Sequence, residues 1–325
     1  MGITVITGAA GFLGSHLARR LVEAGTEVVG IDNGSTGRES NIKPFAGYAN
    51  FRLVLGDVTV PSTLEALADL DPGRVTEIYH LASPASPVYY QAHPIATIEA
   101  NTTGLRHMLE LARHHGARLL YASTSEAYGD PEVHPQPEEY RGNVNTWGPR
   151  ACYDEAKRLG EVYCYEYYRL YGTRVRVARI FNTYSAGLRN DDGRVISNFV
   201  TQALAGRDIT VYGDGSQSRS FCYVDDTVAG LQLLMEKEAA EGQIVNIGNP
   251  AEYSILEVAR LVKRLTGSAS AIKFLPLPAD DPKVRRPVID KAVRLLGWTP
   301  KIGLEEGLKL TVDAYRQAMR EGEKP

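Results

Sequence analysis

Near its start the chain reads Ile3-Thr4-Val5-Ile6-Thr7-Gly8-Ala9-Ala10-Gly11-Phe12-Leu13-Gly14, and an amphipathic pattern continues from there to Ala24. The β-branched apolar run predicts a buried strand, and the pattern after the glycines predicts a helix. A glycine-rich turn between the two lets the backbone approach a pyrophosphate, which then lies at the helix N-terminus. The glycines are spaced Gly-x-x-Gly-x-x-Gly, wider than the plain Gly-x-Gly-x-x-Gly fingerprint, so the turn by itself is also compatible with having no ligand.

The acidic residue after the next apolar run favours a dinucleotide-binding glycine turn over a turn that has no ligand. The run from Glu27 to Ile31 ends in Asp32, at about the distance from the glycines at which a carboxylate holds an adenosine ribose. A carboxylate there repels a 2′-phosphate, which predicts NAD rather than NADP, although Arg38 lies near enough to leave NADP open. We expect the cofactor to contact the glycine turn and the residues that end the next strands: Gly8, Gly11, Phe12, Leu13, Gly14, Asp32, Asn33, Asp57, Val58, Leu81, Ala82 and Ser83.

Further apolar runs, separated by helical stretches, predict the rest of a sheet. Strands are predicted at Phe51 to Leu55, Glu77 to Leu81, Leu119 to Ala122, Val175 to Ile180 and Ile244 to Ile247. This alternation is typical of an α/β fold, a Rossmann-type doubly wound parallel sheet, here with a smaller C-terminal α/β substrate lobe. We expect residues 1–181 and about 225–248 to form the cofactor domain, and residues 182–224 and 249–325 to form the lobe, with a binding cleft between them.

Two groups of residues with reactive side chains lie close together in the sequence, and both could face this cleft. The strand Leu119 to Ala122 runs into Ser123-Thr124-Ser125-Glu126 at its carboxyl end, where open α/β sheets bind ligands. In Tyr153-Asp154-Glu155-Ala156-Lys157, a helix would place the phenol and the ammonium one turn apart on one face. The positive charge would lower the pKa of Tyr153 toward the working pH, as a general base acting on a sugar hydroxyl requires. Tyr-x-x-x-Lys alone, in a chain with 18 Tyr, is more often a surface pair at helical spacing.

Bulk composition narrows the class of protein. The chain has 325 residues, a hydrophobic content of 43%, a formal net charge of −3 and 3 cysteines. The charge gives no support to a nucleic-acid surface, no apolar run approaches the ~20 residues of a membrane span, and no cluster of His, Cys and carboxylates has metal-ligand spacing. The odd cysteine count without a Cys-x-x-Cys pair favours a reducing compartment, and the first strand begins almost at Met1 without a signal peptide. We therefore expect a cytoplasmic protein with no membrane or nucleic-acid partner.

Two long helical stretches, Ile95 to His115 and Arg150 to Tyr171, flank the strand that begins at Leu119. The second carries more aromatic surface than one sheet face can cover: Tyr163, Tyr165, Tyr167, Tyr168 and Tyr171. The surplus predicts a helix bundle between two copies, a homodimer, although packing into the chain's own core is nearly as good an explanation. The loop from Ser83 to Pro94, with Tyr89 and Tyr90, is predicted either to wall the cleft or to be a packed surface loop.

Taken together, these motifs resemble those of the extended short-chain dehydrogenase/reductase family, whose members act on nucleotide sugars. The resemblance covers nearly the whole chain and rests on Thr7-Gly8-x-x-Gly11-x-x-Gly14, Asp32, Ser123-Thr124 and Tyr153-x-x-x-Lys157. Within the family it is closest to the UDP-glucuronic acid decarboxylases, through His80-Leu81-Ala82-Ser83-Pro84-Ala85-Ser86-Pro87, Ser123-Thr124-Ser125-Glu126, Gly129-Asp130-Pro131-Glu132-Val133-His134-Pro135-Gln136, Gly148-Pro149-Arg150-Ala151-Cys152-Tyr153-Asp154-Glu155 and Arg179-Ile180-Phe181-Asn182. A 4,6-dehydratase would be expected to have Asp where this chain has Ser125, and a 4-epimerase usually lacks the carboxylate of Glu126.

The resemblance implies a reaction of a UDP-sugar on one bound NAD, with no metal. It implies that Tyr153, assisted by Thr124, takes the C4 hydroxyl proton, while Lys157 lowers the tyrosine pKa and holds the nicotinamide ribose. The C4 ketone would accept the electrons released when the C6 carboxylate leaves as carbon dioxide, and its reduction would give UDP-xylose. The implied catalytic set is Thr124, Ser125, Glu126, Tyr153, Lys157 and Arg285. The implied substrate contacts are Asn182 and Asn198 for polar groups, Arg194 and Arg219 for the diphosphate and Tyr212 for the uracil. Arg285 is implied either to lie near the leaving carboxylate or to organise the proton donor.

Two departures from the family pattern fall near the sugar. Glu99-Ala100-Asn101 stands where Lys-Thr-Asn is usual, and Ser185-Ala186-Gly187 stands where Gly-Pro-Arg is usual. They bear on substrate affinity and on the final reduction, so release of some UDP-4-keto-xylose is a reasonable variant. The alternatives are a nucleotide-sugar 4-epimerase or 4,6-dehydratase, which needs no C6 carboxylate, and a catalytically silent NAD sensor, which would need no tuned phenol. Each arginine alone is about equally explained as an ordinary surface ion pair.

Overall fold

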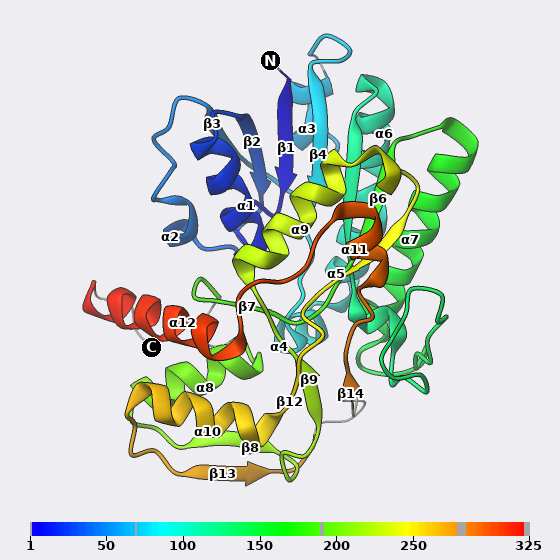
Figure 1. Cartoon of the computed structure of the whole chain (residues 1–325). Coiled ribbons are helices and arrows are strands. Elements are labelled where there is room, and N and C mark those ends of the chain that lie inside the picture. The colour runs from blue at the N-terminus through cyan, green and yellow to red at the C-terminus, as the bar shows by residue number, and fades with distance from the viewer. Residues whose placement is uncertain (1, 69, 189–191, 278–283, 322–325) are drawn as a thin grey trace.

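The sheet predicted from the apolar runs is present in the computed structural model, which describes residues 2–68, 70–188, 192–277 and 284–321 (Figure 1). Within these residues one seven-stranded sheet has the order β11-β6-β5-β4-β1-β2-β3, and each neighbouring pair is parallel. Its strands are β1 (Ile3–Thr7), β2 (Glu27–Asp32), β3 (Phe51–Leu55), β4 (Val75–His80), β5 (Arg118–Thr124), β6 (Val175–Ile180) and β11 (Ile244–Ile247). The chain winds outward from β1 in both directions, which confirms the doubly wound fold.

Both faces of the sheet are covered, because alternate residues of each strand point to opposite sides. Leu120 of β5 packs in one apolar cluster with α1 (Phe12–Glu23) and α9 (Val224–Glu236). Its neighbours Leu119 and Tyr121 pack in a second cluster with α6 (Leu105–His115) and α7 (Ala151–Tyr171). Figure 1 shows α1 and α9 together in front of the sheet. Burial on both sides explains why the strands read as continuous apolar runs.

The helix predicted from Ile95 to His115 is interrupted. It begins as α5 (Pro94–Glu99), passes through a π-helical segment, η1 (Ala100–Gly104), and continues as α6. Asn101 in this segment is buried, and its side chain donates to Ser83 Oγ at 2.9 Å and to the Thr97 carbonyl at 2.8 Å. The π-helical segment thus carries the residue that bonds this helix to Ser83, which follows β4. The short helices of this half are α2 (Glu39–Ile42), α3 (Ser62–Ala68), α4 (Pro87–Ala92), η2 (Ser125–Tyr128) and η3 (Glu238–Ala240).

A smaller lobe lies beyond the carboxyl ends of the strands, in the lower part of Figure 1. It contains α8 (Val195–Leu204), α10 (Ile255–Thr266) and α12 (Leu304–Arg320), with β8 (Ile209–Tyr212) paired to β13 (Ile272–Leu275), and β9 (Ser218–Ser220) between β12 (Glu252–Ser254) and β14 (Val284–Arg285). The paired strands β7 (Thr183–Tyr184) and β10 (Cys222–Tyr223) connect the two halves. α11 (Asp290–Leu296) returns to the first half, where it packs against β11 and α9.

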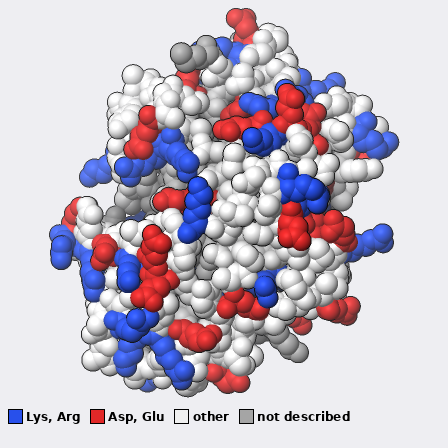
Figure 2. Space-filling view, in the orientation of Figure 1, with Lys and Arg blue, Asp and Glu red and all other residues white. Residues whose placement is uncertain are grey.

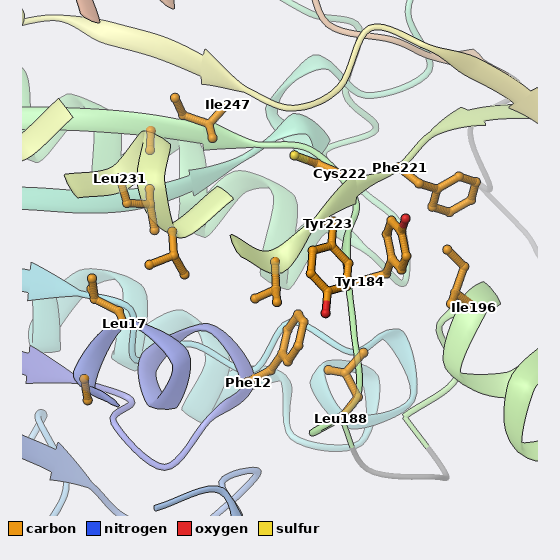
Figure 3. Packing of buried hydrophobic residues seen from close by; sticks show 14 of the residues in the cluster. Phe12, Leu17, Tyr184, Leu188, Ile196, Phe221, Cys222, Tyr223, Leu231 and Ile247 are labelled. Carbon is orange, nitrogen blue, oxygen red and sulfur yellow. The ribbon is translucent and has the colours of Figure 1, made fainter. Parts of the chain in front are cut away.

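One apolar cluster runs through both halves (Figure 3). Leu17 and Ile247 lie at its sheet side, and Phe221 lies at its lobe side. Between them the ring of Tyr184 packs edge to face against Phe221 and Tyr223, with ring centres 6.4 and 5.6 Å apart. Because these side chains are shared, the cluster fixes how the lobe sits over the sheet.

The tyrosines of α7 divide between the core and the surface. Tyr167 is buried and its hydroxyl donates to Glu110 at 2.6 Å. Tyr165, Tyr168 and Tyr171 are 61%, 40% and 52% exposed. Packing into the chain's own core therefore accounts for Tyr167, and the dimer stays a prediction that rests on the exposed tyrosines. On the face seen in Figure 2, acidic and basic side chains are interspersed rather than gathered in one broad basic surface.

Candidate functional site

A cavity of about 630 Å³ opens at the carboxyl ends of the strands, between the sheet and the smaller lobe. Open α/β sheets bind ligands at this edge, near the point where the strand order reverses. Its wall includes every residue predicted to contact the cofactor: Gly8, Gly11, Phe12, Leu13, Gly14, Asp32, Asn33, Asp57, Val58, Leu81, Ala82, Ser83, Tyr153 and Lys157. Residues separated by as much as half the chain are thereby brought to one surface.

The glycine turn lets a ligand approach the first turn of α1. Gly8 has a φ of +71°, a conformation that side chains rarely adopt, and a Cβ on Gly14 would lie 2.0 Å from the Gly8 carbonyl oxygen. The helix begins at Phe12 without a side-chain cap, and its first residues line the cavity. An uncapped helix N-terminus beside glycines fits a pyrophosphate, because its N–H groups and the helix dipole favour negative charge.

Asp32 lies in the cavity wall at the carboxyl end of β2. Its carboxylate accepts hydrogen bonds from the backbone N–H groups of Ala10 and Gly34, at 2.9 and 2.8 Å, which leaves lone pairs for ribose hydroxyls. Asn33 donates to Asp57 at 2.8 Å. Partial burial pushes the pKa of Asp57 upward, but hydrogen bonds, including that from Asn33, hold it below its usual value. Two carboxylates in this wall fit NAD better than NADP.

The loop after β2 also reaches the segment that leads to the lobe. Arg38 Nη1 donates to the Leu188 carbonyl at 3.1 Å. Asn41 Nδ2 donates to the carbonyls of Ala10 and Gly187, both at 3.0 Å. Gly187 and Leu188 line the cavity, so these bonds close its adenosine end.

Tyr153 and Lys157 stand one helical turn apart in the middle of the cavity. Lys157 Nζ lies 5.8 Å from the centre of the Tyr153 ring and donates to the Ala122 carbonyl at 2.6 Å. Burial lowers the pKa of Lys157 to about 7. Burial also raises the pKa of Tyr153 to about 12, although a hydrogen bond with Thr124 opposes the rise. The predicted lowering of the tyrosine pKa is thus absent in the protein alone, because burial outweighs the stabilisation of the phenolate.

The loop with Tyr89 and Tyr90 forms part of the cavity wall, as one of the two alternatives predicted. The ring of Tyr90 stacks on that of Tyr153, with centres 5.0 Å apart and planes inclined by 3°. The stack holds the Tyr153 ring from the side of α4. Ser86 at the start of α4 donates to the Asp192 carbonyl at 2.5 Å, which joins this loop to the segment before α8.

Glu126 is held between two arginines. Arg285 Nη1 donates to Glu126 Oε1 at 2.8 Å and to Ser125 Oγ at 3.0 Å, and Arg150 Nη2 donates to Glu126 Oε2 at 2.5 Å. Burial alone would raise the pKa of Glu126, but the charges of Arg285 and Arg150 hold it at about 2. Glu126 and Arg150 line the cavity, whereas Arg285 is 1% exposed and lies behind Glu126. Arg285 therefore faces the carboxylate of Glu126 rather than the cavity.

The lobe supplies the far wall of the cavity. Of the residues predicted to bind substrate, all but Arg285 line it: Asn182, Arg194, Asn198, Tyr212 and Arg219. Arg194 pairs with Asp192 at 2.9 Å. Gln217, which the motifs did not indicate, also lines this wall, and its Oε1 is buried without a hydrogen-bond partner among the described residues. A buried acceptor of this kind suits a ligand N–H.

The sequence model of the NAD dependent epimerase/dehydratase family matches residues 4–248. The chain belongs to this family. NAD is the cofactor of the family, and the glycine turn and Asp32 fit it. Among relatives, the chain is 52% identical over 315 residues to UDP-glucuronic acid decarboxylase 1 of Xenopus tropicalis, covering 97% of this chain and 72% of that protein. It is 48% identical over 313 residues to UDP-glucuronic acid decarboxylase 5 of Arabidopsis thaliana, covering 96% and 89%.

One solved structure with a similar fold contains both a nucleotide sugar and NAD. UDP-glucuronic acid 4-epimerase from Bacillus cereus, in complex with UDP-glucuronic acid and NAD, superposes with a TM-score of 0.87 at 27% identity, covering 97% of this chain and 99% of that chain. Within residues 2–68, 70–188, 192–277 and 284–321, no group of three or more His, Cys, Asp or Glu side chains could hold a metal ion. In the same ranges no helix is both long and apolar enough to cross a bilayer.

Three residues of the site escaped prediction from the motifs. Arg150 belongs to a quoted motif, but nothing in the sequence pairs it with Glu126, which is 24 residues earlier. Asn41 lies in the short helix α2 and Gln217 in a loop, and no spacing in the sequence marks either of them. The available signal was weak: Arg150 precedes Asp154 by one helical turn at the start of a helix that carries Tyr153.

Proposed function

We propose that this chain decarboxylates UDP-glucuronic acid to UDP-xylose through a UDP-4-keto intermediate, using a bound NAD. The observation that carries the proposal is the position of Glu126 and Arg150 in the wall of the cavity that also contains Tyr153 and Lys157, with Arg285 bonded to Glu126 from behind. A carboxylate-arginine cluster beside the oxidising pair suits a sugar that carries its own carboxylate at C6. The identity to UDP-glucuronic acid decarboxylases over nearly the whole chain supports the same conclusion.

The first step removes the proton of the C4 hydroxyl and the hydride on C4. Tyr153, hydrogen-bonded with Thr124, accepts the hydroxyl proton as a tyrosinate that Lys157 stabilises, and becomes a neutral phenol. NAD, when bound, supplies the acceptor for the hydride and returns it to C4 at the end. Because burial raises the pKa of Tyr153, the tyrosinate is the minor form in the protein alone, and it forms by loss of the phenol proton to solvent before the hydroxyl proton is taken. Stacking on Tyr90 keeps its ring from turning away.

The second step breaks the bond between C5 and C6. The ketone at C4 lies β to the carboxylate, so it accepts the electron pair of that bond as carbon dioxide leaves. A proton then adds to C5, and Tyr153 returns its proton to the C4 oxygen as the ketone is reduced. The net change consumes one proton and releases one carbon dioxide. Glu126 and Ser125, both in the wall, are proposed to orient the sugar and the proton donor, and Arg285 to hold Glu126 ionised.

The lobe is proposed to hold the UDP portion, and the half that contains the sheet to hold NAD. Arg194 and Arg219 suit the diphosphate, Asn182 and Asn198 suit polar groups of the ligand, and Tyr212 suits the uracil, since all line the far wall. Of the first departure from the family pattern, Glu99 is exposed and lies outside this wall, whereas Ala100 lines the cavity. Of the second departure only Gly187 lines the cavity, at the end proposed for the adenosine. We therefore propose that neither Glu99 nor Gly187 alters the choice of sugar.

The test is incubation of the NAD-loaded protein with UDP-glucuronate in deuterium oxide, followed by mass analysis. The expected product has lost one carbon dioxide, carries one deuterium at C5, and forms without net NADH. Accumulating NADH together with the keto sugar would show early release of the intermediate. A product of unchanged mass inverted at C4 would instead favour an epimerase, and conversion of a neutral nucleotide sugar with loss of water would favour a 4,6-dehydratase.

We also propose that the protein is a homodimer through α7 and the adjacent α5. The outer side of α7 exposes Leu159, Val162 and Tyr165 by 46%, 53% and 61%, and α5 packs beside it with Ile95 65% exposed. Apolar side chains gathered on two neighbouring helices favour a helix bundle between two copies. Val162→Glu is expected to convert the dimer to a monomer in light scattering. The control is Leu310→Glu on the exposed side of α12, which is expected to leave the protein dimeric. A monomeric unmodified protein would contradict the proposal.

A further inference from the structure

The face of α7 that carries Tyr153 and Lys157 continues to Glu161, one helical turn further on. Lys157 Nζ donates to the Ala122 carbonyl at 2.6 Å, and the next residue of β5, Ser123, donates through its Oγ to Glu161 Oε1 at 2.6 Å. Ala122 and Ser123 both line the cavity. Two consecutive residues at the end of β5 therefore hold two consecutive turns of α7.

Glu161 is also bound from β6. Arg179 Nε and Nη2 donate to the two oxygens of the Glu161 carboxylate at 2.8 and 2.7 Å, and both side chains are 10% exposed. Ser123 and Arg179 are partners in the register of β5 and β6, so their side chains point to the same face of the sheet. Two further titratable groups face Glu161, Tyr121 of β5 and Cys164 of α7. Burial, and to a lesser extent the charge of Glu161, raises the pKa of both, so both stay neutral.

This ion pair interrupts an apolar surface. Tyr121 and Val177, the preceding residues on this face of β5 and β6, belong to the apolar cluster that packs against α7. Apolar side chains in place of Glu161 and Arg179 would continue that packing, and a buried ion pair commonly adds no stability over such a replacement. Both side chains lie outside the cavity wall, so they do not contact a ligand. The negative charge is better explained by its neighbour Lys157.

Lys157 is 3% exposed, and an ammonium at this depth is favoured by a nearby anion. The titratable groups that face it are His80 of β4, Tyr121 of β5, and Tyr153 and Glu161 of α7. Burial lowers the pKa of His80 to about 3 and raises the pKa of each tyrosine, so these three are neutral at pH 7. Glu161 is the anion among these groups. Burial lowers the pKa of Lys157 to about 7, and the charge of Glu161 opposes that fall.

We propose that Glu161 is a positioning residue for Lys157: it fixes this part of α7 on β5 and balances the buried positive charge of the ammonium. The bonds from Ser123 and Arg179 keep its carboxylate in one place. The proposal rests on the proposed function in so far as Lys157 must be charged to stabilise the tyrosinate of Tyr153. The sign follows from the charge. Without Glu161, Lys157 loses its proton at a lower pH, and turnover begins to fall at a lower pH as well.

The test removes both charges of the ion pair and replaces them with apolar side chains. Glu161→Leu/Arg179→Met is expected to keep a melting temperature close to that of the unmodified protein. The titration of Lys157 is followed by NMR of protein with isotope-labelled lysine, and its signal is assigned by its absence from Lys157→Met. This titration is expected to move about one pH unit lower in the double variant. At about pH 8, kcat for UDP-glucuronate is then expected to fall roughly tenfold, and KM to change by less than about twofold.

The matched control is Glu77→Leu/Arg118→Met. It replaces a second ion pair of the sheet, between β4 and the first residue of β5, away from the cavity. This control is expected to leave the titration of Lys157 and kcat as they are in the unmodified protein. A merely structural role for Glu161 would give the same result in Glu161→Leu/Arg179→Met, because that variant keeps the packing.

An unchanged titration of Lys157 in folded Glu161→Leu/Arg179→Met, or an unchanged kcat, would overturn the proposal. If the double variant does not fold, Glu161→Gln removes the charge alone, and the same titration decides. The NMR measurement needs no substrate, so the two proposals fail separately. A lower titration of Lys157 in the variant of a protein that does not decarboxylate UDP-glucuronate would refute the proposed function alone.

Discussion

Lys157 Nζ lies 5.8 Å from the centre of the Tyr153 ring, and the two side chains are 3% and 6% exposed. An ammonium at this depth stabilises a phenolate but is itself costly to keep charged. The pKa of Lys157, lowered to about 7 by burial, is the measure of that cost. Chemistry at Tyr153 is therefore supported by a group that destabilises the fold.

Lys157→Met is expected to abolish turnover and yet raise the melting temperature. The folded pKa of Lys157 lies below its unfolded value, so the native state binds fewer protons than the unfolded chain between the two values. The cost of burying the charge is complete below about pH 7 and shrinks as the pH rises toward the unfolded value. Calorimetry should therefore show a gain of several degrees at about pH 6.5 that diminishes at about pH 9.5. Equal gains at both pH values would contradict this account.

Glu126→Gln is expected to destabilise the protein by about 3 kcal/mol at neutral pH, because it leaves the buried guanidinium of Arg285 without its anion. The pKa of Glu126 is held at about 2, below its ordinary value, so the stabilisation is present above that ordinary value and is lost as the pH falls toward about 2. Urea unfolding at neutral and acidic pH measures the difference. Glu166→Gln breaks an exposed ion pair with Arg169 and should change stability by less than about 1 kcal/mol.

Asn41→Ala is expected to release NAD several times faster. The Asn41 amide bridges the carbonyls of Ala10 and Gly187 at the adenosine end of the cavity, so its loss loosens that end. Faster release during a turnover should also leave more NADH and keto sugar in solution. The rate is measured by displacement with excess labelled NAD.

Asn50→Ala is the matched control for this experiment. Asn50 also bridges two carbonyls, those of Val22 and Thr26, at 2.9 and 2.8 Å, but it lies outside the cavity wall. It should lose comparable stability without faster NAD release. If both variants released NAD equally fast, the effect would be one of general stability.

The fold could be predicted from the sequence because its signals are local. The β-branched and apolar runs set the bounds of β1, β3, β6 and β11, which begin and end where predicted. The interruption of the helix at Ala100–Gly104 could not be predicted, since its cause is the packing of Asn101 against residues after β4. The spacing of apolar residues along the chain does not indicate contacts between residues that are distant in the sequence.

The residues of the candidate site could also be predicted only where their signal is local in the sequence. Gly14, Asp32 and Tyr153 belong to short motifs, and the cavity wall contains all of them. The partners of Glu126 could not be predicted, because Arg285 is 159 residues away in the sequence. The direction of the pKa of Tyr153 was also beyond reach, since it depends on the degree of burial, which only the packed structure gives.

The shared apolar cluster of Figure 3 has a consequence for how the molecule denatures. Leu308 and Val312 of α12 belong to the same cluster as Leu17 of α1. α12 itself packs against α8, α10 and β10, and β10 connects the two halves, so we expect that removing α12 leaves neither half as an isolated folded fragment. Heating should unfold both halves in one cooperative transition, so binding of the dinucleotide and binding of the nucleotide sugar should be lost at the same temperature.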